Sequence, residues 1–61
     1  MINLKEVRKA KGFTQEELAA KCDVQRTTVT MIETGENLPS VQLAKKLAEV
    51  LDVDWTEFFN E

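Results

Sequence analysis

The sequence lacks histidine and tyrosine, and its 61 residues include one cysteine, one proline and two glycines. Without histidine the commonest metal ligand and general base is missing, and a single cysteine permits no disulfide within the chain. No apolar run approaches the roughly 18 residues of a membrane span, and no signal-peptide pattern follows the first methionine. We therefore expect a soluble cytoplasmic protein with no cofactor, no metal, no small-molecule ligand, no membrane association and no enzymatic activity.

The chain is short and its charge is unevenly distributed. A chain of 61 residues suffices for one domain, residues 1–61, with one thin core, because so small a domain buries only about 60% of its unfolded surface. The net charge is −3. Residues 1–30 carry six basic and four acidic residues, whereas residues 31–61 carry two basic and seven acidic residues. The N-terminal half is therefore the better candidate to face phosphates, and the acidic half should face away from them.

Helix starts recur along the chain. Three capping residues are each followed three positions later by a glutamate that can bond back to the cap: Asn3 with Glu6, Thr14 with Glu17, and Asp54 with Glu57. Ser40 is a fourth cap, and Gln25 marks a weaker start. The helix after Ser40 has a regularly spaced apolar face, which we expect to point inward: Val41, Ala44, Leu47, Ala48 and Leu51. The sequence thus predicts an all-α domain of five helices.

Small or turn-forming residues mark where four of these helices end. Gly12 and Gly35 follow the first and third helices, where a left-handed residue closes the last turn. Asp23 and Asp52 occupy the same places after the second and fourth. Aspartate tolerates this conformation less well than glycine, by on the order of 1 kcal/mol. We expect these two turns to be local weak points or to adopt another geometry.

Residues 15–34 form two short amphipathic segments joined by a tight turn. Their apolar residues recur at helical spacing: Leu18, Cys22, Val24, Val29 and Ile32. Ala19 is small, so the two helices can cross closely at a steep angle. This pattern predicts a helix-turn-helix over residues 15–34, and it makes Cys22 a small buried apolar residue rather than a redox or metal site.

From Leu4 to Phe59 the chain resembles the Cro and phage-repressor class of helix-turn-helix regulators, the xenobiotic-response-element-type family. The usual run of that family is close to LKxxRxxKGxTQEELAxKxGVxxxTIxxIExGxxxPS, and this chain has LKEVRKAKGFTQEELAAKCDVQRTTVTMIETGENLPS. The resemblance implies a five-helix repressor-like domain that binds double-stranded operator DNA, usually as a homodimer, with its third helix in the major groove. The alternative is a helix-turn-helix domain used for protein contact, such as an antitoxin or co-regulator.

On a helical wheel, one side of the third predicted helix is polar and lies opposite Val29 and Ile32. Together with the residues at the helix start, this side predicts a base-reading set: Gln25, Arg26, Thr27, Thr30 and Met31. Arginine can bond guanine, glutamine can bond adenine, and threonine or methionine can pack on a thymine methyl. The family often has arginine or another polar residue where this chain has Met31, and basic residues near the positions of Glu36 and Asn37. These departures bear on DNA affinity rather than on fold.

The resemblance also places two helix N-termini near the DNA backbone, where free amides attract phosphates. The predicted phosphate contacts are Thr14, Gln15, Thr34, Asn37, Ser40 and Gln42. Thr14 and Ser40 can equally serve as ordinary caps. Gln15 has no capping duty, and its long donor arm suits a phosphate oxygen.

Two further sets concern structure and assembly. The resemblance pairs Arg8 of the first helix with Glu33 of the third as a structural ion pair. The last helix is rich in aromatic residues, and the family's dimers suggest a two-fold partner over this end, through Leu43, Val50, Trp55 and Phe59. Alternatively, Trp55 and Phe58 close the core and only Phe59 is exposed.

Overall fold

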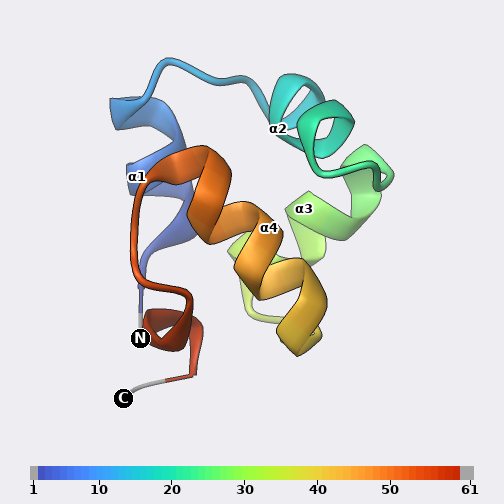
Figure 1. The fold of residues 1–61 in the computed structure, drawn as a ribbon. Coiled ribbons are helices and arrows are strands. Elements are labelled where there is room, and N and C mark those ends of the chain that lie inside the picture. The colour runs from blue at the N-terminus through green and yellow to red at the C-terminus, as the bar shows by residue number, and fades with distance from the viewer. Residues whose placement is uncertain (1, 60–61) are drawn as a thin grey trace.

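A computed structural model describes residues 2–59 (Figure 1). The chain folds into α1 (Leu4–Ala10), α2 (Gln15–Lys21), α3 (Arg26–Thr34), α4 (Val41–Leu51) and the 3₁₀ helix η1 (Trp55–Phe58). Within this part of the chain every regular element is helical, as the sequence predicts. No helix among residues 2–59 has the length and hydropathy to cross a bilayer.

The prediction of a fifth α-helix is not confirmed, because η1 is a single 3₁₀ turn of four residues. The side chain of Asp54 accepts from the amide of Thr56 at 3.0 Å and from its hydroxyl at 2.7 Å. This bond reaches two residues along the chain instead of the three that an α-helical capping box requires, so it favours the tighter turn.

The other caps form where the sequence places them. Thr14 and Glu17 make both bonds of a capping box, at 3.0 and 2.9 Å. The side chains of Asn3 and Ser40 each accept one amide three residues ahead, at 3.1 Å. Gln25 makes no side-chain cap bond, in agreement with its weaker signal.

All four turn residues adopt the left-handed conformation. Gly12 and Gly35 have φ of 80° and 83°, and Asp23 and Asp52 have φ of 58° and 57°. The two aspartates therefore take the glycine-like geometry despite its cost, and do not avoid it with another turn.

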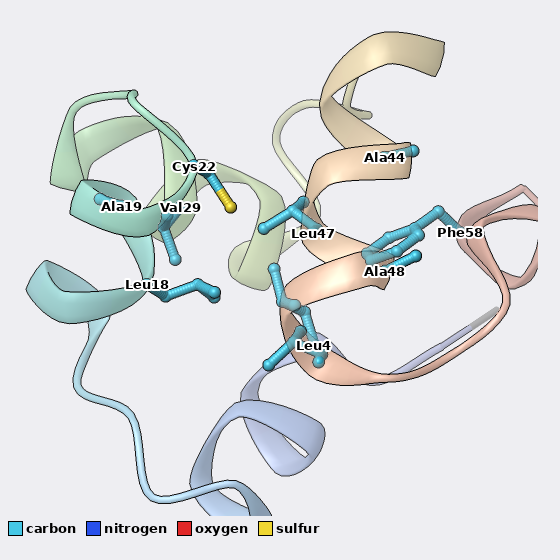
Figure 2. Close-up of a cluster of buried hydrophobic side chains, with 10 residues drawn as sticks. Leu4, Leu18, Ala19, Cys22, Val29, Ala44, Leu47, Ala48 and Phe58 are labelled. Carbon is cyan, nitrogen blue, oxygen red and sulfur yellow. The ribbon is translucent and has the colours of Figure 1, made fainter.

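The core is one cluster of side chains contributed by all the elements (Figure 2). It consists of Leu4, Leu18, Ala19, Cys22, Val29, Ala44, Leu47, Ala48, Leu51 and Phe58. The prediction that Val41 points into the core is wrong, because this residue is 50% exposed in the first turn of α4, at the edge of the cluster. The prediction that Cys22 is buried is confirmed, and its sulfur lies among the apolar side chains in Figure 2.

Two packing contacts dominate the arrangement. Helices α2 and α3 pack on each other across the tight turn, and Ala19 is 2% exposed in α2. Helix α4 packs on η1, and the amide of Ile2 donates to the carbonyl oxygen of Glu57 at 3.0 Å. In Figure 1, η1 accordingly lies beside the N-terminal end of the chain.

Candidate nucleic-acid interface

One side of α3 is turned toward the core and the other side toward solvent. Val29 is fully buried, and Figure 2 shows it directed toward the other core side chains. Among the predicted base-reading residues, Gln25, Arg26 and Thr27 are exposed, while Thr30 and Met31 are half-buried. The structure therefore brings the five residues together on or beside the solvent-facing side of α3.

A buried ion pair joins this helix to α1. Nε of Arg8 lies 2.7 Å from Oε2 of Glu33, and Nη2 lies 3.5 Å from Oε1. The remaining branch of the guanidinium donates to the carbonyl oxygen of Phe13 at 2.7 Å. The two side chains are only 9% and 4% exposed. A charge-assisted pair in such a dry place has directional geometry, so it orients α3 as well as attracting it.

The side chain of Gln15 is bonded within the protein, whereas the sequence suggested that it is free to contact a phosphate. Its amide nitrogen donates to Oε1 of Glu33 at 3.0 Å, and its amide oxygen accepts from the hydroxyl of Thr30 at 3.2 Å. Gln15 thus links α2 to α3 through the ion pair of Arg8. We call the four side chains of Arg8, Gln15, Thr30 and Glu33 the polar network.

Sequence reasoning did not foresee these bonds of Gln15. Its partners lie 15 and 18 residues away along the chain. Local patterns report neighbours within about one helical turn, so only the crossing of α2 and α3 reveals the contact.

Four of the other five predicted phosphate residues also make internal bonds, and the fifth, Gln42, is exposed. The hydroxyls of Thr14 and Ser40 cap their helices. The hydroxyl of Thr34 donates to the carbonyl oxygen of Met31 at 3.1 Å, and Nδ2 of Asn37 donates to the sulfur of Met31 at 3.1 Å. Hydroxyl and amide groups of this kind keep further lone pairs or protons, so these bonds are compatible with a phosphate contact.

An open cleft of about 590 Å³ separates the end of α1 and the following loop from the start of α3. Its lining contains three basic residues and one acidic residue: Arg8, Lys9, Gly12, Phe13, Thr14, Gln15, Glu16 and Arg26. Lys9, which is exposed, is a candidate phosphate contact that the sequence analysis overlooked. Its signal was available in the basic balance of residues 1–30.

At the opposite end of the molecule, aromatic side chains form a partly exposed patch. The rings of Trp55 and Phe59 meet edge to face at 6.2 Å, and Nζ of Lys45 lies 5.2 Å from the Trp55 ring centre. Phe59 is 38% exposed, Trp55 is half-buried, and Phe58 is buried in the core. Leu43 and Val50 of α4 are half-buried, and Leu43 lines a separate cleft beside the α2–α3 turn. We call the two rings of Trp55 and Phe59 the aromatic patch.

Two titrating groups lie away from the α3 surface. Burial raises the pKa of the Cys22 thiol above its usual 9.0, and the nearby charge of Lys46 only partly offsets this effect. The bonds from Thr56 lower the pKa of the exposed Asp54 carboxylate. Among residues 2–59 no cluster of three or more acidic, cysteine or histidine side chains is placed to hold a metal ion.

Comparison with known proteins adds independent information. A family model described as helix-turn-helix matches residues 4–58. The uncharacterized HTH-type transcriptional regulator YqaF of Bacillus subtilis is 50% identical over 58 residues, which cover 95% of this chain and 76% of that protein. The HTH-type transcriptional regulator SinR of Bacillus licheniformis is 37% identical, over 95% of this chain and 53% of that protein.

A solved structure is also similar. The N-terminal DNA-binding domain of SinR from Bacillus subtilis superposes with a TM-score of 0.83 and 36% sequence identity. The match covers 95% of this chain and 86% of that chain. At this identity, similarity extends to sequence as well as fold.

Proposed function

Because this chain belongs to the helix-turn-helix family and is a DNA-binding transcriptional regulator, we propose that it is a repressor that reads operator DNA with α3 in the major groove. Gln25, Arg26, Thr27, Thr30 and Met31 would face base edges. A helix of this diameter fits the major groove, where each base pair presents a distinct set of donors, acceptors and methyl groups.

The observation that carries this proposal is that the polar side chains at the start of α3 are exposed and make no hydrogen bonds within the part of the chain that the structure describes. Gln25, Arg26 and Thr27 are exposed, and none of their side chains takes part in a hydrogen bond with any residue in the range 2–59. The helix that presents them is held by the buried polar network. Unengaged donors on a rigidly held helix are what base recognition requires, because little side-chain bonding has to be broken on binding.

Backbone contacts would surround this reading surface. We assign them to Thr14, Gln15, Thr34, Asn37, Ser40 and Gln42, and we add Lys9 from the cleft. Net charge does not oppose this assignment, since the basic residues concentrate in residues 1–30 and the acidic excess lies in residues 31–61.

We further propose that the protein binds as a homodimer through the aromatic patch. One α3 contacts only about four or five base pairs, too few for specificity among the roughly 10⁶ or more competing sites of a genome. Two copies related by a two-fold axis would read inverted half-sites about 10 base pairs, or 34 Å, apart. The 38% exposure of Phe59 supports this surface.

Selection of bound sequences from random duplex DNA tests the proposed function directly. The recovered site should contain inverted half-sites. Arg26→Ala should weaken binding to that site by about 5- to 150-fold, or 1–3 kcal/mol, with little change on random DNA. Lys5→Ala is the control, because it removes an exposed positive charge on α1 rather than on α3.

Two outcomes would count against this reading. Equal loss on preferred and random DNA would make Arg26 a phosphate contact instead of a base reader. If no duplex is enriched and binding does not weaken with salt, the domain serves protein contact instead.

Phe59→Lys tests the dimer. Phe59 is partly exposed, so the monomer should remain folded while cooperative DNA binding falls. Sedimentation with and without the selected site measures the assembly. One subunit on a non-symmetric site at saturation would exclude the dimer, and unfolding of the variant would show that Phe59 belongs to the core.

A further inference from the structure

The exposed side of α3 divides into two parts according to what its polar groups already bond. Toward its C-terminal end, the hydroxyl of Thr30 lies 3.2 Å from Oε1 of Gln15 and 3.1 Å from the carbonyl oxygen of Arg26. The hydroxyl of Thr34 donates to the carbonyl oxygen of Met31. A hydroxyl has one proton, so both threonines use their only donor within the protein.

Met31 is also held by its own chain. Its sulfur accepts from the amide of Asn37 at 3.1 Å, and its carbonyl oxygen accepts from the amides of Glu36 and Asn37 at 3.0 and 3.3 Å. A thioether is only a weak acceptor, and here that acceptor is occupied. Neither residue has a free donor left, so Thr30 and Met31 can offer DNA their methyl groups and, for Thr30, the acceptor lone pairs of its hydroxyl.

The start of α3 is the reverse case. The side chains of Gln25, Arg26 and Thr27 make no hydrogen bond to residues 2–59 and are exposed. The reading surface therefore presents donors and acceptors at one end of the helix and methyl groups at the other.

Building on the proposed function, we propose that Thr30 and Met31 determine specificity by packing on thymine C5-methyl groups, while Arg26 and Gln25 read hydrogen-bonding edges elsewhere in the half-site. In unmodified DNA the thymine methyl is the apolar feature of the major groove. Methyl groups whose polar neighbours are already satisfied meet it without leaving a buried donor unpaired.

Uracil substitution tests the contact with minimal disturbance, because uracil keeps the pairing and groove oxygens of thymine and lacks only the methyl. Thymines of the selected half-site are replaced one at a time, and affinity is measured by fluorescence anisotropy. Loss of one buried methyl should weaken binding about fourfold at each contacted thymine and leave the other thymines unchanged.

Two substitutions at Thr30 separate its methyl from its hydroxyl. Thr30→Ser keeps the hydroxyl and its bond to Gln15 but lacks the methyl, so it should bind thymine and uracil equally at one position. Thr30→Val keeps a methyl and lacks the hydroxyl, so it should retain the fourfold preference. Met31→Ala should abolish the preference at a different thymine.

The outcomes are distinguishable. If the parent selects a site but tolerates uracil at every position, this inference is overturned while the proposed function stands. If Thr30→Val, and not Thr30→Ser, loses the thymine preference, the preference depends on the bond between the Thr30 hydroxyl and Gln15 rather than on the Thr30 methyl, and the inference is equally overturned. If no duplex is selected, both proposals fail.

Duplexes that carry 5-methylcytosine test the methyl contact on a different base pair. At a contacted position the pair of 5-methylcytosine with guanine should bind more tightly than unmethylated cytosine with guanine, because it restores a methyl at the same place in the major groove. If methylation of cytosine gives no gain in affinity at any contacted position, the methyl is not what Thr30 and Met31 read, and the inference is overturned.

Discussion

The two halves of the molecule are held together by different forces. Among residues 2–59, every side-chain hydrogen bond between two α-helices lies in α1–α3, where the polar network joins them. Helix α4 and η1 are held instead by buried apolar side chains such as Leu47, Leu51 and Phe58. Their side-chain hydrogen bonds are the local ones of Ser40, Asp54 and Thr56.

This difference corresponds to different tasks. Hydrogen bonds are directional, so the polar network fixes how α3 sits relative to α1 and α2. Apolar burial is non-directional and scales with area, so α4 and η1 supply stability without setting a particular angle at the DNA. A domain that must hold one helix in a fixed orientation therefore needs directional hydrogen bonds to that helix. Apolar packing in the rest of the domain is enough to supply stability.

The largest effect should come from breaking the polar network. Arg8→Ala leaves the carboxylate of Glu33, 4% exposed in its side chain, without its charged partner. Removal of one partner from a buried pair costs about 3–5 kcal/mol, a large part of the stability of a small domain. Urea denaturation measures the loss, and the DNA affinity per folded molecule should also fall, because α3 loses bonds that orient it.

A matched double variant checks the cause. Arg8→Met with Glu33→Leu removes both charges, so it should recover much of the stability lost by Arg8→Ala. If Arg8→Ala instead melts like the parent and binds DNA poorly, Arg8 acts as a phosphate contact.

Truncating a buried apolar side chain of α4 should lower the unfolding free energy by a comparable amount, over a wider range. It should leave the orientation of α3 unchanged. Leu47 is fully buried, so Leu47→Ala should cost about 2–5 kcal/mol of unfolding free energy. At a temperature where the variant remains folded, its affinity per folded molecule should equal that of the parent. A reduced affinity of the fully folded variant would show that apolar packing also orients α3.

Relieving the two left-handed aspartates should stabilise the protein slightly. Asp23 at φ 58° and Asp52 at φ 57° pay a conformational cost that glycine avoids. We expect Asp23→Gly and Asp52→Gly each to raise the unfolding free energy by up to about 1 kcal/mol. Thermal melts measure the gain, and Gly35→Ala, at φ 83°, should show the opposite sign.

The smallest effect is a dependence on pH, with opposite signs in the two halves. Burial raises the folded-state pKa of Cys22 above 9.0, so its contribution is present at neutral pH and fades as pH rises through that value. Asp54 has a lowered pKa, so its contribution fades as pH falls below its usual 3.8. Cys22→Ala and Asp54→Ala should each flatten one end of the stability profile; an unchanged profile in either variant would contradict its assignment.

Much of the fold could be read from local patterns. The caps at Asn3, Thr14 and Ser40 and the turn at Gly35 involve residues within one helical turn, so the sequence predicted them correctly. Asp54 misled because the same residue can close either a capping box or a shorter turn, and its bond to Thr56 favours the latter.

The candidate site was less accessible to sequence reasoning. The polar side of α3 follows from its period, but whether a polar group on it is free depends on distant partners. Gln15, Thr30 and Asn37 all seemed available to DNA, and the structure places each in a bond within the protein. Among residues 2–59, Gln25, Arg26, Thr27 and Gln42 are exposed and make no side-chain hydrogen bond, as the polar pattern alone suggests.

The sequence alone determined the helical periodicity, the capping and the burial of Leu18, Val29 and Leu47. These features follow from local backbone geometry and from the hydrophobicity of each residue. The bond of Gln15 to Glu33 and the exposure of Val41 were decided only when the helices packed. Such features depend on the distance between groups many residues apart, and a close crossing of helices is what brings those groups within reach of a hydrogen bond or leaves them outside the core.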